Sequence, residues 1–339
     1  MAGRLGTPRW LFVAVLLLPG MGLAGEPRPL LVPPELAEVT SNPEISGITW
    51  SPLRRRYLLV TDDSGLRSKG TAHAPLLLGL SEAGVLDATP IAIRGIKALN
   101  DPESMCAGPG GTYFLVTSHS PNREDETPSP RRQLLQLKEG DGGLDVVARM
   151  DLTAIAGGRS LLAAAGAAPR GRLDVEALAY HDDMLFVGLK SPLTERGEAV
   201  ILRLPRPLET MRGGHVRGAA IERLAAVPLC VAAKQRRVCQ GISDMTFLPD
   251  GSMVLSANAP KGGPKDHGGA LWHLPTPVGK ASPVLLQRFP KLAPEGVTLD
   301  SNGRSLVVVF DCRDAAPRWT KIPLPVSRPH VNANSVGVP

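Results

Sequence analysis

The sequence is poor in aromatic residues. Trp, Tyr and Phe together make up 4% of the 339 residues. Aromatic residues do not interleave with the basic clusters Arg54–Arg56, Arg131–Arg132 and Arg236–Arg237. Surfaces that bind nucleic acid combine basic side chains with rings on which the bases stack. The sequence therefore predicts solvated turns at these clusters and no nucleic-acid partner.

Standard catalytic and metal-finger motifs are also missing. The chain has no GxSxG elbow, HExxH helix, P-loop or GxGxxG turn. Its four cysteines, at positions 106, 230, 239 and 312, include no CxxC pair, which excludes a zinc finger. In an oxidising compartment Cys230 and Cys239 could close the short loop between them. Cys106 lies in an apolar run and is expected to be a buried thiol.

No apolar run is long enough to cross a membrane. The N-terminal run, Leu11–Leu18, is shorter than the roughly 20 residues that a spanning helix needs. Arg4 and Arg9 precede this run, and the small-residue stretch Gly22–Ala24 follows it. These features predict a signal peptide over residues 1–24. We expect a periplasmic or secreted protein that is not inserted in a membrane after cleavage.

Glycine and proline, in contrast, are abundant, with 36 and 33 residues. Both interrupt helices, so they favour short strands joined by turns. A unit made of an acid, an apolar strand, a turn and a second apolar strand recurs along the chain. The acids that begin the units are Glu44, Glu103, Glu176, Asp244 and Glu295.

The repeat predicts an all-β fold, a β-propeller with five blades. The turns contain residues that accept positive φ, as in Pro249–Ser252, and two looser strands follow each hairpin. We expect one domain over residues 25–325, with a tail at 326–339. The last unit lacks a fourth strand, and residues 30–40 are expected to supply it and close the ring. A sixth, degenerate blade within 193–240 is the alternative.

One further segment, the Ala-rich stretch 153–169, is expected to be a short helix or an excursion between the second and third blades.

The acids are expected to meet at one end of the propeller axis. The first strand of each blade lines the channel and the second runs antiparallel to it, so the start of one and the end of the other share a face. The residues expected to join the five acids there are Asp62, Asp63, His119, Lys190, Asn258 and Asp311. A slip of one residue in this register would turn a side chain away.

Electrostatics leaves two interpretations of these acids open. Two carboxylates about 5 Å apart repel by roughly 3 kcal/mol at an effective dielectric constant near 20, so several of them need compensation. A hard cation, Ca²⁺ or Mg²⁺, would supply it. The candidate ligands are Glu44, Glu103, Glu176, Asp244, Glu295, Asp62, Asn258 and Asp311. Alternatively, the acids accept backbone N–H bonds and hold neighbouring blades together.

The other candidate site residues also have two interpretations each. His119 is either a general base suited to neutral pH or a rim histidine bonded to its neighbours. Lys190 either contacts an anionic substrate or neutralises Glu176. His267, in a Gly-rich segment, is a weaker candidate for a loop that overhangs the mouth.

Several motifs in order resemble a bacterial exported propeller family, domain of unknown function 3616. They are "DPESM…YFLVTSHS", "DVEALAY…LFVGLKSPL", "GISDMTFLPDG" and "LAPEGVTL". The chain is also distantly similar to phytase-like, esterase-like and gluconolactonase propellers, and this resemblance implies acids at the channel mouth that hold divalent metal. Lys190 and Ser243 stand where the family pattern has Arg, which weakens the grip on phosphate that a phytase needs.

Two functions follow as expectations. The first is a Ca²⁺-dependent hydrolase of small esters, lactones or phosphoesters. The second is a non-catalytic propeller that binds a small molecule or an envelope protein, and the missing catalytic motifs favour it. A monomer is expected in either case.

Overall fold

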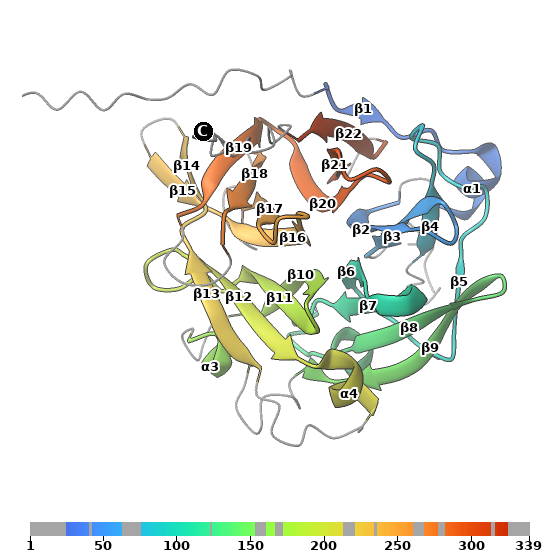
Figure 1. The fold of residues 1–339 in the computed structure, drawn as a ribbon, viewed down its shortest axis with the longest axis horizontal. Coiled ribbons are helices and arrows are strands. Elements are labelled where there is room, and N and C mark those ends of the chain that lie inside the picture. The colour runs from blue at the N-terminus through green and yellow to red at the C-terminus, as the bar shows by residue number, and fades with distance from the viewer. Residues whose placement is uncertain are drawn as a thin grey trace, which may run out of the picture.

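Five of the six sheets formed by the described strands surround a central axis, and the fold is the five-bladed β-propeller that the repeat predicted (Figure 1). This structure is a computed structural model. It describes residues 25–40, 43–62, 76–122, 124–152, 161–166, 172–212, 221–233, 236–259, 268–276, 282–312 and 316–324. The predicted signal 1–24, the tail 326–339, Asp63 and His267 lie outside these ranges. Within the ranges, no helix has the length and apolar character needed to span a bilayer.

In every blade the strand that begins the repeat unit is the innermost, and the next strands of the unit lie further out; β5 in blade 2 and β1 in blade 5 come earlier in the chain and are the outermost strands. Blade 1 contains β2 (Ile45–Ser51), β3 (Arg56–Thr61) and β4 (Leu77–Leu80). Blade 2 contains β6 (Pro102–Ala107), β7 (Thr112–Thr117), β8 (Leu134–Gly140), β9 (Gly143–Met150) and β5 (Ala92–Arg94). Blade 3 contains β10 (Asp174–His181), β11 (Met184–Ser191), β12 (Ala199–Pro205) and β13 (Glu222–Val227). Blade 4 contains β16 (Gly241–Phe247), β17 (Met253–Asn258), β18 (Gly269–Leu274) and β19 (Val284–Phe289). Blade 5 contains β20 (Ala293–Leu299), β21 (Ser305–Asp311), β22 (Arg318–Pro323) and β1 (Arg28–Pro29).

The N-terminal segment closes the ring, but with different residues from those expected. The closing strand is β1, which pairs antiparallel with β22. Residues 30–40 were expected to be this strand, yet they contain the helix α1 (Pro34–Val39). Pro34 stands in the first turn of that helix, where its missing N–H is not needed. The edge of the last blade is therefore covered by only two paired residues.

Blade 1 also differs from the expectation. Of the two looser strands expected after its hairpin, the second was expected at residues 89–95, but β5 leaves the blade and pairs in parallel with β9 of blade 2. Single bridges from Leu31 to Val85 and from Leu80 to Leu86 lie beside β4 instead. This strand exchange ties blade 1 to blade 2 at the outer edge.

The core is divided among the five gaps between neighbouring blades. On β3, Tyr57 and Leu59 pack in a cluster shared with blade 5, whereas Leu58 and Val60 pack in a cluster shared with blade 2. The other three gaps hold equivalent clusters. Both faces of each second strand are thus covered, which explains their continuous apolar sequences.

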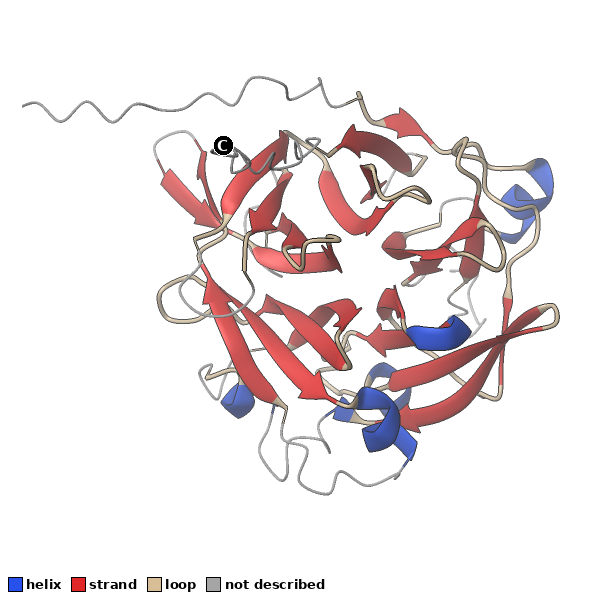
Figure 2. Ribbon diagram, in the orientation of Figure 1, coloured by secondary structure: helices blue, strands red, loops and turns tan. Residues whose placement is uncertain are grey.

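The described residues within 193–240 do not form a sixth blade. They supply β12 and β13 to blade 3, the helix α4 (Pro207–Arg212), and the hairpin β14 (Cys230–Ala233) with β15 (Arg236–Cys239). The disulfide Cys230–Cys239 closes this hairpin, as expected. The described part of the Ala-rich stretch contains the short helix α3 (Leu161–Ala164). The helices α1, α3 and α4 lie at the periphery of the ring (Figures 1 and 2).

Candidate functional site

A β-bulge at the same place in all five inner strands sets the geometry of the site. The ladder between the first and second strand of each blade skips one residue of the first strand. The skipped residues are Ser46, Glu103, Glu176, Ser243 and Glu295. A bulge re-aims the side chain of the extra residue and often lies next to a functional site.

This register corrects two of the five predicted acids. Glu103, Glu176 and Glu295 occupy the bulge, but serines occupy it in blades 1 and 4. Asp244 lies one position after the bulge, and Glu44 lies two positions before it. The prediction aligned the units on their acids. Aligning them on the residue that follows the bulge, which is small in four of the five units, would have given the observed register.

The position after the bulge forms a ring of small residues around the axis, with one exception. Its members are Gly47, Ser104, Ala177, Asp244 and Gly296. A Cβ atom on Gly47 would lie 2.8 Å from the carbonyl oxygen of Glu103, so the inner strands approach one another too closely there for a larger residue.

Asp244, the exception, braces the centre of the ring. It is 1% exposed. Its Oδ1 accepts from the Ser104 hydroxyl at 2.9 Å and its Oδ2 from the Val297 N–H at 3.0 Å. The Ser104 oxygen in turn accepts from the N–H of Leu178 at 3.0 Å. These bonds link blades 2, 3, 4 and 5. Burial raises the pKa of Asp244, and N–H groups including that of Ile48 in blade 1 oppose this rise.

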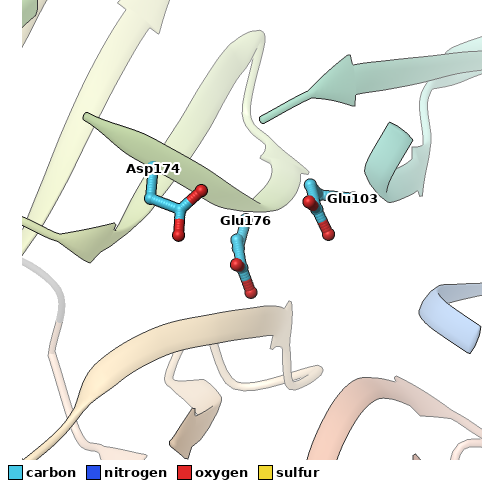
Figure 3. A group of neighbouring side chains, drawn as sticks. All are labelled: Glu103, Asp174 and Glu176. Atoms are coloured by element: carbon cyan, nitrogen blue, oxygen red, sulfur yellow. The ribbon is translucent and has the colours of Figure 1, made fainter. Parts of the chain in front are cut away.

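Three other carboxylates meet at the mouth, which we define as Glu103, Asp174, Glu176, Lys190 and Glu295. One oxygen atom each of Glu103, Asp174 and Glu176 lies within 4.8 Å of the other two. Asp174 and Glu176 come from β10 and Glu103 from β6 (Figure 3). The acid ring did not include Asp174, although it stands two residues before Glu176.

Glu103 is the least compensated of the three. It is 8% exposed. Within the described residues no hydrogen bond or ion pair reaches its carboxylate. Burial raises its pKa well above the usual glutamate range, and the negative charges of Glu176, Asp101, Asp62 and Asp174 raise it further. A carboxylate in such surroundings favours a bound proton or a bound cation.

Lys190 neutralises the opposite side of the mouth. Its Nζ lies 2.6 Å from Oε2 of Glu176 and 3.3 Å from Oε2 of Glu295. Burial alone would lower its pKa, but Glu176, Glu295 and Asp174 together raise it. The ammonium group is therefore held charged between two carboxylates. This is the second of the two roles expected of Lys190.

A second pair of charges lies beside the mouth. Asp101 forms a buried ion pair with Arg131, whose Nε also donates to the Ser120 carbonyl at 3.0 Å. Arg131 is 7% exposed and is not the solvated turn residue that the sequence predicted. Its hydrogen bonds to the Ser118 and Ser120 hydroxyls fix the loop after β7. Nothing in the local sequence distinguishes it from its half-buried neighbour Arg132.

The structure does not bring His119 to the carboxylates. Its Nδ1 is bonded to the Thr117 carbonyl at 2.7 Å, and the ring is buried. Burial lowers its pKa to about 4, and the charged groups that act on it are Asp151 and Arg132. His119 is therefore neutral at pH 7 and lies apart from the mouth.

The remaining predicted ligands are distributed along the same rim. Asn258 donates its amide N–H groups to the Ser243 hydroxyl and the Pro294 carbonyl, so it joins blades 4 and 5. The half-buried Glu44 accepts the N–H of Asp62 through its backbone carbonyl, and the Asp62 charge acts on Glu103. Asp311 ends β21 and pairs with Ala293. Among the described residues, the carboxylate cluster consists of Glu103, Asp174 and Glu176 and includes neither Glu44 nor Asp311.

The dimensions of the cluster fit one hard cation. Ca²⁺ takes roughly six to eight oxygen ligands at about 2.3–2.6 Å, so two oxygens on opposite sides of one ion lie about 5 Å apart. The carboxylate oxygens of the cluster lie within 4.8 Å of one another, which is within this oxygen–oxygen distance. Three protein ligands would leave the remaining positions for water or substrate.

Comparisons with known proteins add little to this description. No family model and no curated protein matches the chain. Three solved structures align with it at low identity. The first is the extracellular domain of a hybrid two component system from B. thetaiotaomicron (9% identity, TM-score 0.36, 82% of this chain and 27% of that one). The second is a hypothetical protein from Leishmania major (11% identity, TM-score 0.47, 89% of this chain and 91% of that one). The third is an endo-arabinase from Bacteroides thetaiotaomicron (12% identity, TM-score 0.46, 84% of this chain and 95% of that one).

The chain spans about a quarter of the first of these structures. All three likenesses are too distant to transfer an activity. The resemblance to the exported propeller family therefore stays a prediction, and the fold rests on the sheet topology of this chain.

Proposed function

We propose that the mouth binds one Ca²⁺ ion through Glu103, Asp174 and Glu176, and that the protein is a hydrolase of small, uncharged esters or lactones. The observation that supports this proposal is the Glu103 carboxylate, which is buried among four other acids and has no hydrogen bond or ion pair with any described residue. Oxygen donors alone favour a hard cation over zinc.

The bound ion would polarise the substrate carbonyl and lower the pKa of a bound water. The protein residues supply the rest. Lys190 holds Glu176 and Glu295 in place, and the pair Arg131–Asp101 fixes the neighbouring loop. His119 is not part of this machinery, because its imidazole is buried and turned to Thr117.

The charge of the mouth argues against an anionic substrate. Six carboxylates act there, those of Asp62, Asp101, Glu103, Asp174, Glu176 and Glu295, against two cations, Lys190 and Arg131. One divalent ion would still leave a negative site among the described residues. Phosphoesters would be repelled, and the clamped Lys190 has no free charge with which to attract them.

The experiment compares binding and turnover in matched variants. Isothermal titration with Ca²⁺ is expected to give one site in the native protein, weakened at least tenfold in Glu103→Gln. Asp145→Asn removes a carboxylate that pairs with Arg94 at an exposed position, and it serves as the control with unchanged affinity. A screen of neutral lactones, neutral esters and phosphomonoesters follows. The expected result is Ca²⁺-dependent turnover of the neutral substrates only, lost in Glu103→Gln.

A non-catalytic binding propeller is the second candidate. The observation that favours it is the state of the nearby hydroxyls. Ser118 and Ser120 are bonded to each other and to Arg131, so neither is poised as a nucleophile. Ca²⁺ binding without turnover of any screened substrate would support this candidate and reject the hydrolase.

A further inference from the structure

The opposite end of the propeller axis contains a cavity of about 690 Å³, which we call the funnel. It is lined by the C-terminal halves of the inner strands and by the hairpin turns that follow. Each blade contributes, and Trp50, Ala107, Tyr180, Phe247 and Asp300 are among the lining residues. Cavities of roughly 300–1,000 Å³ are the usual size of small-molecule sites.

The funnel is separate from the mouth. The ring of small residues, with Asp244 bonded to Ser104 and Val297, lies between the two along the inner strands. A ligand in the funnel therefore does not reach Glu103. Ligand binding in the funnel does not depend on the hydrolase activity proposed for the mouth, and either proposal can fail without the other.

The lining offers no positive charge to an anionic ligand. Among the described residues that form it there is no Lys, Arg, His or Glu side chain. Its one carboxylate, Asp300, is 6% exposed, and its Oδ1 accepts the N–H groups of Arg304 at 2.9 Å and Ser305 at 3.1 Å. An anion entering the funnel would lose its water without gaining a cationic partner, which is costly. The site thus selects against anions.

Three aromatic rings give the wall fixed flat faces. Trp50 packs edge-on against Tyr57 at 4.9 Å between centroids, and Tyr180 stacks on Phe114 at 5.7 Å. Phe247 stacks on His181 at 4.4 Å. All three wall rings are only half buried, although the chain has few aromatic residues in total. Rings held in this way lose little entropy when they contact a ligand.

We propose that the funnel binds an uncharged small molecule that contains a planar apolar ring. The lack of a cation in the described lining disfavours anions, the buried Asp300 is bonded to the backbone of its own turn, and the prearranged aromatic faces favour a flat partner over a flexible chain. The lining hydroxyls of Thr246 and Thr298 would orient a carbonyl or hydroxyl group of the ligand.

Two dyes that share one skeleton test the proposal. N-phenyl-1-naphthylamine is neutral, and 8-anilinonaphthalene-1-sulfonate carries an added sulfonate. Fluorescence titration of the folded protein is expected to show one site for the neutral dye and at least tenfold weaker binding of the sulfonate. Equal affinities would overturn the proposal, because they would show that the site does not discriminate between a neutral and a charged ligand.

Matched variants show where on the protein the dye binds. Ala107→Trp adds a ring inside the funnel at an exposed lining position, and it is expected to weaken the neutral dye at least tenfold. Val147→Trp adds the same ring on β9, at a position that is 54% exposed and outside the funnel, and should change nothing. Leu53→Asp, at a 72% exposed position of the rim, gives a second loss of binding without a change in the core.

Two outcomes would reject the proposal at this stage. Undiminished binding in both funnel variants would place the dye elsewhere. A dimer that forms on concentration and excludes the dye would make a second copy of the chain the occupant of the rim. Size-exclusion chromatography at the titration concentrations distinguishes this case from a small-molecule site.

Discussion

Asp244 at the centre of the ring and Glu103 at the mouth are both buried carboxylates of inner strands, yet their surroundings are opposite. Asp244 accepts hydrogen bonds from Ser104 and Val297, whereas no donor within the described residues reaches Glu103. In register they differ by one position relative to the bulge. The comparison shows that hydrogen-bond partners, and not burial or the type of side chain, separate an acid that holds the fold together from one that is available for a ligand.

The largest expected effect is the loss of the central brace. Asp244→Ala would leave the Ser104 hydroxyl and the Val297 N–H buried without an acceptor, so we expect a loss of about 3–5 kcal/mol in the free energy of unfolding. Urea denaturation in EDTA measures it. A loss under about 1 kcal/mol would show that the acid at the centre does not brace the blades.

The next largest effect is the pH dependence of stability that comes from His119, which is opposite in sign to that of the acid Glu103. Its pKa is about 4 in the folded protein against an ordinary 6.5. Between these values the unfolded chain binds a proton that the folded chain does not. The stability that depends on neutral His119 is therefore full above pH 6.5 and is lost as pH falls toward 4, by about 3 kcal/mol in total.

Urea denaturation at pH 7, 5.5 and 4.5 checks this effect in the native protein and in His119→Gln. The difference in stability between the two proteins should shift in favour of the variant as pH falls. A difference that is constant across this range would mean that His119 is exposed to solvent or charged in the folded state. The raised pKa of Glu103 acts in the opposite direction, since protonation of the folded protein stabilises it as pH falls.

The smallest effect should have the opposite sign to that of Asp244→Ala. Without metal, Glu103→Gln removes a charge that is repelled by Glu176 and Asp101, so we expect stabilisation on the order of 1 kcal/mol at pH 7.5 in EDTA. The control Asp145→Asn loses an exposed ion pair with Arg94, whose contribution is small. If Glu103→Gln destabilised the protein as much as Asp244→Ala, the two acids would have the same role.

The sequence predicted the elements whose signals are local. Turn residues such as Asp182 and Asp183, both with positive φ, mark the hairpins, and apolar runs mark the strands that are covered on both faces. It misplaced the closing strand and the fourth strand of blade 1, since β1 has two residues and β5 pairs with a distant strand. Pairings of this kind leave no periodic pattern in the chain.

The arrangement of the site, like that of the fold, was predicted only where the sequence repeat carries the signal. The convergence of Glu103, Glu176, Glu295 and Lys190 followed from the repeat. The bulge that separates Asp244 from these acids leaves no mark in composition, and alignment on charge concealed it. The burial of Arg131 depends on a loop fold that its own sequence does not show.

Melting temperatures in EDTA and in millimolar Ca²⁺ test the central claim most directly, for the native protein, Glu103→Gln and Asp145→Asn. A ligand at 100 times its dissociation constant stabilises the folded state by about 2.7 kcal/mol, which raises the melting temperature of a chain this long by at least about 3 °C. The account predicts this rise in the native protein and in Asp145→Asn, and none in Glu103→Gln. An unchanged melting temperature of the native protein, or an equal rise in Glu103→Gln, would contradict it.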